Sequence, residues 1–504
     1  MNIAIIGAGI SGIATAIILQ KAGHKVTLYE KNTEIGGVWA MSYPDVRLQN
    51  VGVQYCFSDF PWPKKPDQHP TAAQITDYLK QAITHFSLDV RTGHQILSME
   101  EKPNGWTLNI ENAEGTSTIE MDYVISAIGQ YSGGKNRPEF KGESIFKGQI
   151  ITERDVKDLS IFSGKKVAVV GFGKSALDMA TLAGKNGAEV EHIFRTPRWT
   201  IPFKIMGIHY TYPLFSRFGS VMMSSWAHPS KVEQVLHQKM SFVVNGFWKM
   251  LSGLFATQMK ANAWFKGKDA KQRIHAVLPD HPFTMDLRSA AALEPVLYYP
   301  YVAKGIIQPH QGTLQSFTEK GIKLQDGCEI DADIVVLSLG SQKPRFPFMP
   351  ENYRSLLEQE KDGVQLYRHI IHPDIPNFAF AGYNHGFMHV PAAEVGAAWL
   401  AAVLDGDLKL PTSEDMKKAI EYMCHWKREH IHFEPSRSCA INTRYQQYLD
   451  IMLKELQVSP YRKSNPVAEV FGRYEASDYL GVYEEYINKK EKRKAPLSSL
   501  ELWT

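Results

Sequence analysis

The chain opens with MNIAIIGAGISGIATAIILQKAGHKVTLYEK, residues 1–31. Its apolar runs predict a buried strand, a helix and a second strand, in that order. In the turn before the helix, Gly7 permits a tight bend, Gly9 lets a ligand approach the backbone, and Gly12 lets the helix pack closely on the strand. Glu30 ends the second strand, where a carboxylate can accept hydrogen bonds from ribose hydroxyls. The stretch therefore predicts a dinucleotide-binding unit with the phosphates at the helix N-terminus.

A second stretch, VAVVGFGKSALDMATLAGKNGAEVEHIFRTPR at residues 167–198, repeats this pattern. Gly171 and Gly173 occupy the first two glycine positions of the turn. Ala176 occupies the third position, which is permitted where helix and sheet lie slightly further apart. The repeated unit predicts a second dinucleotide.

The acid of the first unit is missing from the second. In the first unit Glu30 lies about 20 residues after the glycine turn. Counting the same number of residues from the second turn leads to Phe194 and Arg195, and Arg198 lies just beyond them. A guanidinium here can bind the 2′-phosphate of NADP through paired charge-assisted hydrogen bonds, which favours NADPH over NADH. Exposed surface arginines are the alternative interpretation. FAD and NADPH are the simplest pair of cofactors for the two units, because a hydride can pass from nicotinamide to flavin.

The composition is that of an ordinary globular protein. With 504 residues, the chain exceeds the roughly 250–300 at which single cores split, so two or three domains are expected. Hydrophobic residues make up 44% and charged residues 22%, and a net charge of +3 is too small to indicate a nucleic acid or membrane partner. The first strand begins at about Asn2, so we expect no leader or transit sequence.

The four cysteines lie far apart in the sequence, at Cys56, Cys328, Cys424 and Cys439. They form no CxxC pair, which argues against a redox-active disulfide and against a metal site. A reduced, cytoplasmic protein is expected.

Alternating strand and helix patterns predict an α/β fold with two Rossmann-like dinucleotide-binding domains. We expect residues 1–155 to form the first part of the FAD-binding domain and residues 306–410 its second part. Residues 156–305 are expected to form the NADPH-binding domain, with an aromatic-rich helical insertion at about 200–300. Residues 411–504 predict a helical C-terminal extension.

The insertion contains the apolar stretch SFVVNGFWKMLSGLFATQMK, residues 241–260. Asn245, Lys249 and Gln258 interrupt it, so it falls short of the roughly 18 uncharged residues that a membrane span needs. Three interpretations of this stretch are left: a helix at a membrane interface, a helix in the core and a lid over the substrate site. The surrounding aromatic residues predict the wall of an apolar substrate site, an ordinary core or a dimer interface; they are Trp199, Trp226, Phe247, Trp248, Phe255, Trp264, Phe265 and Tyr298.

Several further motifs resemble those of the flavin-containing monooxygenases. GGVW at residues 36–39 and NVGVQYCFSDFPWP at 50–63 resemble the family's GGxW and N…FSDFPxP segments. GFGKSALD (171–178) resembles the family's NADPH turn. SAIGQYS (126–132) and DIVVLSLG (333–340) resemble its two interdomain linkers, and PAAEVGAAW (391–399) resembles its final helix under the flavin. The resemblance covers about residues 1–200 and 305–405.

The resemblance implies a set of residues that bind FAD or NADPH. They are Gly7, Gly9, Ser11, Gly12, Glu30, Gly37, Val38, Trp39, Gly129, Gly171, Gly173, Lys174, Ser175, Arg195, Arg198, Gly340, Gly382 and Pro391. The helix that begins near Pro391 would direct its N-terminus at the flavin and stabilise the negative charge of the reduced ring. His385 and His389 lie beside this helix start, either facing the ring or serving a structural role.

Asn50 matches the family's active-site asparagine, whose side-chain amide can donate a hydrogen bond to cofactor or peroxide. An asparagine in a turn is the alternative. The family's activity implies that NADPH reduces the flavin and that a C4a-(hydro)peroxyflavin oxygenates nitrogen, sulfur or carbon in a small molecule, with O2 as co-substrate. An NADPH oxidase or flavin reductase, and a non-catalytic binding protein, are the other interpretations.

One segment departs from the family pattern. The family's FxGxxxHxxxF/Y signature reads FKGQIITERDV from Phe146, so that Thr152 replaces the histidine and Val156 the aromatic residue. This departure argues against a typical Baeyer–Villiger enzyme and leaves the coupling between the domains open.

Overall fold

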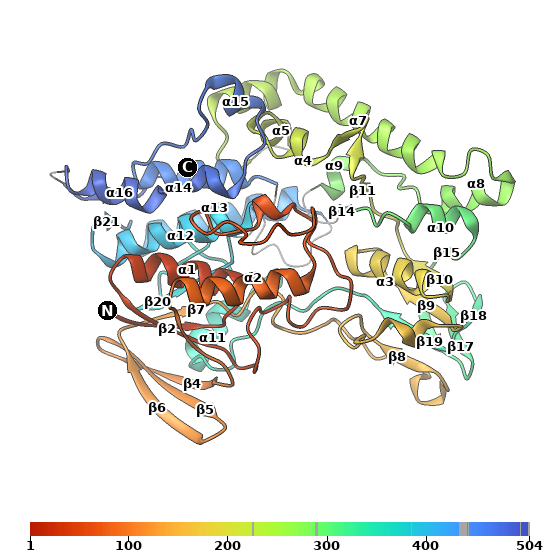
Figure 1. The fold of residues 1–504 in the computed structure, drawn as a ribbon, viewed down its shortest axis with the longest axis horizontal. Helices are drawn as coiled ribbons and strands as arrows, with labels where there is room; N and C mark the ends of the chain where they lie inside the picture. Colours follow the sequence, from red (N-terminus) through yellow and green to blue (C-terminus); the bar gives the residue numbers. More distant parts are fainter. Residues whose placement is uncertain are drawn as a thin grey trace.

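Two parallel five-stranded sheets lie side by side and form the lower part of the molecule (Figure 1). The structure is a computed structural model that describes residues 1–223, 226–287, 291–384, 386–432, 441, 443–493 and 495–501. Each sheet is built around one of the two strand–turn–helix units predicted from the sequence. The α/β fold with two dinucleotide-binding domains is thus confirmed.

The first sheet has the strand order β20-β7-β1-β2-β3, and all of its strands are parallel. Its strands are β1 (Asn2–Ile6), β2 (Lys25–Tyr29), β3 (Asp89–Arg91), β7 (Tyr123–Ser126) and β20 (Phe378–Phe380). The chain runs outward from β1 to β3 and then returns to the other side of β1 as β7. The order therefore reverses between β1 and β7, which is where open α/β sheets bind ligands.

The second sheet repeats this topology with the order β15-β10-β9-β19-β8. Its strands are β8 (Gln149–Ile151), β9 (Lys166–Val170), β10 (Glu189–Phe194), β15 (Ile307–Gln311) and β19 (Ile334–Leu337). The order reverses between β9 and β19, so the second unit has its own switch point.

The sheet partners correct the expected domain boundaries. The sequence places β8 in residues 1–155, and β15 and β19 in residues 306–410, all within the FAD-binding domain. All three strands instead pair within the second sheet, with Ile334 in register with Val167. Apolar periodicity predicts a strand but not its neighbour, because the pairing is decided by contacts far apart in the chain.

Helices cover the sheets and connect them to smaller elements. α1 (Ile10–Lys21) packs against α12 (His389–Leu404), and α3 (Lys174–Lys185) against α10 (Tyr298–Lys304). The remaining elements of the lower part are α2 (Ala72–His85), α11 (Glu351–Glu358) and two antiparallel sheets, formed by β4 (Gln95–Lys102), β5 (Gly105–Asn112), β6 (Gly115–Met121) and by β16 (Leu314–Phe317), β17 (Gly321–Leu324), β18 (Glu329–Asp331).

The insertion and the C-terminal extension form the upper part of the molecule (Figure 1). The insertion contains β11 (Thr200–Ile201), β12 (Lys204–Ile205), β13 (Ile208–His209), β14 (Ala292–Leu293), α4 (Thr211–Leu214), α5 (Arg217–Met222), α6 (Lys231–Gln234), α7 (Ser241–Ala261), α8 (Gly267–Ala276) and α9 (Phe283–Asp286). The extension contains β21 (Leu408–Lys409), β22 (Leu497–Ser498), α13 (Ser413–His430), α14 (Tyr445–Glu455), α15 (Pro466–Phe471) and α16 (Val482–Lys490).

Two arginines join these parts. Arg444 and Glu233 form a buried ion pair, and Arg217 on α5 donates two hydrogen bonds, of 2.6 and 2.9 Å, to Asp450 on α14. Arg217 also pairs with Glu469 on α15. Buried ion pairs with several hydrogen bonds specify one packing arrangement, since breaking one leaves a buried charge uncompensated.

Most aromatic residues of the insertion belong to the hydrophobic core. The buried ones are Trp199, Trp226, Trp248, Phe255 and Tyr298, whereas Phe247 is half-buried and Trp264 and Phe265 are exposed. Within the described ranges, none of the helices has the length and apolarity that crossing a bilayer requires.

Candidate functional site

The first glycine turn lies at the switch point of the first sheet. Gly7 has φ +110°, and a Cβ there would lie 2.7 Å from the carbonyl oxygen of Ala127, which follows β7. A Cβ on Gly12 would lie 2.2 Å from the carbonyl oxygen of Gly7. Both positions therefore exclude a side chain, whereas a Cβ on Gly9 would meet only the Gly37 Cα, at an ordinary contact distance of 3.8 Å. The turn has the shape expected for a backbone cradle around a pyrophosphate.

The Glu30 carboxylate is fixed beside this turn. Oε2 accepts a 3.0 Å hydrogen bond from the backbone N–H of Ala8, and Oε1 accepts bonds of 2.9 and 2.8 Å from the backbone and side chain of Asn32. Oε2, which accepts one of these bonds, can accept another, so the carboxylate is able to bind a ribose hydroxyl.

The GGVW segment closes over the first turn. Gly36 donates a 3.0 Å backbone hydrogen bond to Ala8, and Gly37, with φ +58°, lies directly against Gly9. Val38 is exposed, and the indole N–H of Trp39 donates a 2.8 Å bond to the Tyr55 hydroxyl.

The start of α12 meets the start of α1. Ser11 Oγ and His389 Nε2 are 2.9 Å apart, and a Cβ on Gly382 would lie 2.6 Å from Ser11 Oγ. The Tyr55 ring stacks on His389 at 6.4 Å between centroids, and Pro391 is buried in the first turn of α12. Two helix N-termini therefore converge beside the expected flavin position, where their dipoles favour negative charge. His385 lies outside the described residues.

Asn50 lies next to this convergence. Its buried side-chain amide donates a hydrogen bond to the carbonyl oxygen of Phe387, in the loop that precedes α12. The contact connects the FSDFP-type segment to the flavin-side helix, so Asn50 and α12 occupy the same site.

A buried glutamate makes a second connection of this kind. Glu394 on α12 accepts hydrogen bonds of 3.0 and 3.1 Å from the backbone N–H and the hydroxyl of Ser58. Burial raises the pKa of Glu394 to about 8.

The second glycine turn has the same construction as the first. Gly171 has φ +127°, and a Cβ there would lie 2.3 Å from the carbonyl oxygen of Ser338, which follows β19. Open space surrounds the position where a Gly173 Cβ would lie, as a cradle for a second dinucleotide requires. Ala176 is buried against the turn.

The two arginines after β10 differ in their surroundings. Gly171 donates to the Ile193 carbonyl just as Gly7 donates to that of Tyr29, which makes Phe194 the counterpart of Glu30. Arg195 follows and is exposed. Arg198 is only partly exposed and lies 3.6 Å from the buried carboxylate of Asp286. Arg195 is therefore the more accessible guanidinium at the end of the strand.

The two units are joined beside the second turn. Lys174 and Asp178 on α3 form an ion pair, and the Tyr43 hydroxyl donates a 2.6 Å hydrogen bond to Asp178. Burial and the Asp178 charge raise the pKa of Tyr43, and Ser175 contributes a further contact to this tyrosine. These contacts hold the segment after GGVW against the helix of the NADPH-type unit.

The two interdomain linkers are held together by the residues that directly follow them. Asn136 donates a 2.9 Å backbone bond to Gly340, and Gln342 donates one of the same length to Gly134. Gly129 and Gly340 have φ values of +81° and +87°, so both linkers turn through conformations that favour glycine.

The altered family signature lies beside these linkers. Thr152 is satisfied locally, since its backbone N–H and its hydroxyl each donate a 2.8 Å bond to Asp155, and Val156 is buried in the core. The neighbouring Glu153 is buried and forms an ion pair with Lys135, just after the first linker, and Arg154 donates a 3.3 Å hydrogen bond to the Tyr131 carbonyl within that linker. Contact between linker and domain is thus provided by Glu153 and Arg154 rather than by residue 152.

A histidine pair links the Asn50 segment to the insertion. His69 Nε2 and His209 Nε2 are 3.3 Å apart, His69 Nδ1 lies 3.1 Å from the Leu48 carbonyl, and His209 Nδ1 lies 2.9 Å from the Thr211 hydroxyl. Burial lowers the pKa of both histidines, that of His209 to about 4. Both rings are therefore neutral at neutral pH.

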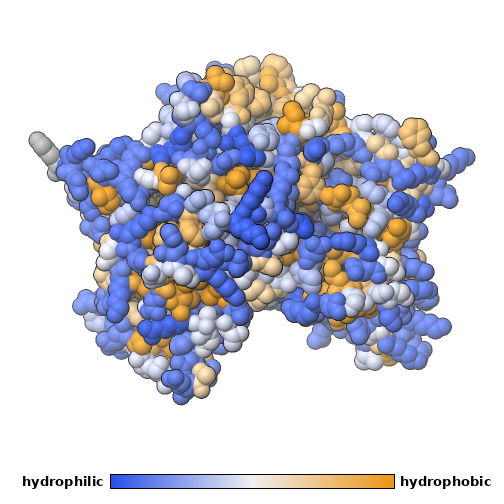
Figure 2. Space-filling model, in the orientation of Figure 1, coloured by the Kyte–Doolittle hydropathy of each residue, from blue (hydrophilic) through white to orange (hydrophobic). Residues whose placement is uncertain are grey.

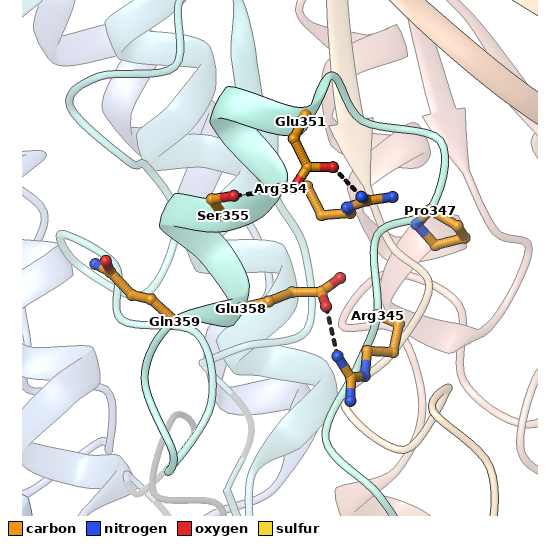
Figure 3. Close-up of a pocket in the computed structure, with 7 residues that line it drawn as sticks. All are labelled: Arg345, Pro347, Glu351, Arg354, Ser355, Glu358 and Gln359. Atoms are coloured by element: carbon orange, nitrogen blue, oxygen red, sulfur yellow. Dashed lines mark hydrogen bonds and ion pairs between the residues drawn. The ribbon is translucent and has the colours of Figure 1, made fainter.

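A surface depression of about 630 Å³ lies apart from these contacts (Figure 3). Residues of α11 and of the segment 345–347 line it, and its charged side chains pair with one another, as Arg345 and Glu358 do at 2.8 Å. We therefore assign no catalytic role to this depression. A separate hollow between the two lower lobes is visible along the lower edge of the molecule (Figure 2).

Comparison with known proteins identifies the family. Residues 1–464 match the family model described as flavin-binding monooxygenase-like. The chain belongs to this family. It is therefore an FAD-dependent monooxygenase, an oxidoreductase that uses FAD and NADP(H) and acts on a small molecule with O2.

Similar proteins cover nearly the whole chain. A probable flavin-containing monooxygenase 1 of Arabidopsis thaliana is 30% identical, over 96% of this chain and 97% of its own length. A 4-hydroxybenzoate brominase (decarboxylating) of Marinomonas mediterranea is 26% identical, over 91% and 84%. The S-allyl-L-cysteine S-oxygenase structure from Allium sativum has a TM-score of 0.62 at 18% identity, with coverage of 98% and 93%, and shares the fold.

Sequence reasoning missed several residues that hold this site together, among them Tyr43, Tyr55, His69, Glu153 and Glu394. Tyr55, Glu153 and Glu394 lie within motifs quoted from the sequence, but none of the five has a spacing that indicates its partner. Their partners lie between 16 and 336 residues away in the chain, for Tyr55 and Glu394 respectively.

Proposed function

We propose that this enzyme uses NADPH and O2 to oxygenate a nitrogen, sulfur or carbon centre of a small organic substrate through a C4a-(hydro)peroxyflavin. The observation that carries the proposal is the position of Asn50, buried and hydrogen-bonded to the loop before α12. An amide there can donate a hydrogen bond at the flavin edge once cofactor contacts replace the Phe387 carbonyl.

The proposed cofactor contacts follow from the two turns. Gly7, Gly9, Gly12 and the N-terminus of α1 would bind the pyrophosphate of FAD, and Glu30 its ribose. The flavin supplies the redox chemistry when bound. Gly382, Ser11, His389 and Pro391 would position the ring at the start of α12, and Gly37, Val38 and Trp39 would cover it.

NADPH would bind at the second turn. Gly171, Gly173, Lys174 and Ser175 would contact its phosphates, and Arg195 its 2′-phosphate, with Arg198 in a supporting position. Gly129 and Gly340 would let the two linkers approach both cofactors. A reduced, cytoplasmic setting suits the free thiols of Cys56, Cys328 and Cys424.

The test is Asn50→Asp in the FAD-loaded enzyme, compared with Asn104→Asp on an exposed turn. The carboxylate cannot donate a hydrogen bond, so we expect oxygenated product to fall about 100-fold or more while flavin reduction by NADPH changes less than about threefold. Product is measured by mass spectrometry with ¹⁸O2 and a panel of amines, sulfides and ketones. Full product formation by the variant would remove Asn50 from the site.

An NADPH oxidase is the competing function. It predicts that NADPH consumption yields stoichiometric hydrogen peroxide with every substrate and that no ¹⁸O enters an organic product. Stopped-flow absorbance after mixing reduced enzyme with O2 distinguishes the two, since the proposal requires an intermediate spectrum before oxidised flavin returns.

A further inference from the structure

The two glycine turns are fixed by different side chains. In the first unit, the Glu30 carboxylate accepts a 3.0 Å hydrogen bond from the backbone N–H of Ala8, the residue between the first two glycines. In the second unit, Phe172 occupies the place of Ala8, and Phe194 occupies that of Glu30. A phenylalanine side chain has no hydrogen-bonding group, so the second turn lacks this restraint. A carboxylate at position 194 would also repel the 2′-phosphate of NADPH.

A buried histidine on the neighbouring strand supports the second turn instead. His192 lies on β10, two residues before Phe194, and its side chain is completely buried. Its Nε2 lies 2.7 Å from the carbonyl oxygen of Gly171, the first glycine of the turn. Its ring stacks on that of Phe172, with 5.3 Å between centroids and an interplanar angle of 17°. His192 therefore contacts both of the residues that open the turn.

The hydrogen bonds of His192 fix its tautomer. A carbonyl oxygen only accepts hydrogen bonds, so Nε2 carries a proton and donates to Gly171. Burial lowers the pKa of His192 to about 4, which leaves the ring neutral and Nδ1 without a proton at neutral pH. The Tyr298 hydroxyl, 2.8 Å away, therefore donates to Nδ1. The three residues form one directed chain of hydrogen bonds, from Tyr298 through His192 to the Gly171 carbonyl.

Tyr298 connects this chain of hydrogen bonds to the end of the helical insertion. It is the first residue of α10, which packs against α3, the helix that begins at the second turn. Its ring is completely buried and lies edge-on to that of His192, with 5.6 Å between centroids. The Phe194 ring lies 4.6 Å from that of Phe172. Phe172 thus contacts three buried rings, and close packing of this kind restricts it to one position.

A leucine stands at the corresponding place in the first unit. Gly7 and Gly171 each donate a backbone hydrogen bond to the neighbouring strand, and these two bonds make Leu28 the counterpart of His192. Leu28 is buried, but its side chain cannot form a hydrogen bond with the turn. Each turn therefore has its own restraint: Glu30 holds a backbone N–H in the first unit, and His192 holds a backbone carbonyl in the second.

We propose that His192 is a positioning residue for NADPH, which holds the Gly171 carbonyl and the Phe172 ring so that the backbone N–H groups of the second turn point at the phosphates of the cofactor. The inference rests on the proposed binding of NADPH at this turn. His192 acts through the backbone of the turn. Because it does so without a carboxylate, the end of β10 stays free to bind the 2′-phosphate through Arg195.

The test is binding of NADP⁺ to the FAD-loaded, full-length enzyme, measured by isothermal titration calorimetry. His192→Leu keeps an apolar side chain in the core and removes the donor to Gly171. We expect the dissociation constant of NADP⁺ to rise about tenfold, because the turn must then be ordered on binding. In stopped-flow reduction by NADPH, the apparent dissociation constant should rise by the same factor, while the limiting rate constant of flavin reduction changes less than about twofold.

His192→Gln is the conservative variant. Its amide can donate to the Gly171 carbonyl and accept from the Tyr298 hydroxyl, so the dissociation constant of NADP⁺ should stay within about threefold of that of the parent enzyme. Val190→Ala is the matched control, because Val190 is buried on the same face of β10 but lies nearer the other end of the strand. It should lower the melting temperature and leave NADP⁺ binding unchanged.

Tyr298→Phe provides a second test should His192→Leu not fold, since it removes only a hydroxyl group. Without that donor, Nδ1 of His192 has no hydrogen bond and the ring is no longer held in one orientation, so we expect NADP⁺ to bind about threefold more weakly. The effects of the two substitutions should not add. The double variant should bind NADP⁺ no more weakly than His192→Leu alone.

Three results would overturn the proposal. The first is unchanged NADP⁺ binding by His192→Leu or, where that variant does not fold, by Tyr298→Phe. The second is a glutamine variant that binds NADP⁺ as weakly as the leucine variant, because the donor to Gly171 would then be irrelevant. The third is an equal loss of NADP⁺ binding in Val190→Ala, which would mean that any weakening of β10 has this effect.

Arg195→Ala separates the role of His192 from the position of the cofactor. Unchanged NADP⁺ binding by Arg195→Ala would mean that NADPH binds elsewhere, and both proposals would then fail. Weaker binding by Arg195→Ala together with unchanged binding by His192→Leu would leave NADPH at the second turn and remove only the role of His192.

Discussion

The Tyr43 hydroxyl donates a 2.6 Å hydrogen bond to Asp178, 135 residues further along the chain. Tyr43 follows the segment that closes over the first glycine turn, and Asp178 lies on the helix that begins at the second. One buried hydrogen bond thus connects the two cofactor units, and Lys174 shares the same carboxylate.

Tyr43→Phe removes this bond and leaves the ring in place. A buried hydrogen bond to a charged group contributes about 1.5–3 kcal/mol, so we expect the free energy of unfolding in urea to fall by about that amount. Tyr461→Phe, with an exposed ring, is the control. An unchanged free energy of unfolding would show that the contact adds nothing to the junction.

Arg195→Ala tests cofactor selectivity. Because Arg195 is exposed at the end of β10, we expect kcat/KM for NADPH to fall about 10- to 100-fold and that for NADH to change less than about threefold. Arg198→Ala is the comparison. Since Arg198 lies beside the buried Asp286, its loss should lower the melting temperature more than it changes selectivity. Equal losses with both nicotinamide cofactors would argue against a 2′-phosphate contact at Arg195.

The His69–His209 pair predicts acid sensitivity. With Nδ1 of His69 donating to the Leu48 carbonyl, Nε2 of His69 accepts a hydrogen bond from Nε2–H of His209 only while the His69 ring is neutral. Nδ1 of His209 accepts from the Thr211 hydroxyl only while the His209 ring is neutral. The charged neighbours that face the pair are Arg47, Lys174, Lys204 and Arg473, all cationic.

Both folded pKa values are lowered, so the stability from this pair is present above the unfolded pKa of 6.5 and is lost as pH falls towards about 4. The melting temperature of His209→Gln should therefore fall less steeply with acid than that of the parent enzyme. His425→Gln, whose ring is exposed, should follow the parent profile. Parallel profiles for all three proteins would exclude the pair as an acid-sensitive contact.

Glu394 predicts the opposite dependence. Its folded pKa is raised to about 8, so its contribution to stability is present below the unfolded pKa of 4.5 and is lost as pH rises through about 8. Glu394→Gln keeps an uncharged side chain of similar shape. We expect the melting temperature of the variant to gain on that of the parent enzyme as pH rises from about 4.5 to about 8 and to keep a constant lead above that, measured by differential scanning calorimetry. A constant difference between pH 4.5 and 8 would mean that the pKa of Glu394 is the same in the folded and unfolded states.

The sequence by itself determined the two dinucleotide units, because their signals are local. Gly7, Gly12 and Gly171 occupy positions where a Cβ meets backbone, and Glu30 follows its strand at a fixed interval. The apolar periods around them are enough to predict strand, turn and helix. The family resemblance rests on motifs of the same short range, and it indicated FAD and NADPH.

Only the tertiary structure decided which strands share a sheet and which distant side chains meet. β8, β15 and β19 join the second sheet through pairings that no local pattern encodes. Contacts such as Tyr43 with Asp178 and Glu394 with Ser58 depend on how two separately folded segments dock. The same holds for α7, whose sequence suits core, lid or interface equally; the packing of its inner face left Phe242 and Lys249 exposed. Periodicity identifies an apolar face, but only the neighbouring elements decide how much of a helix they cover.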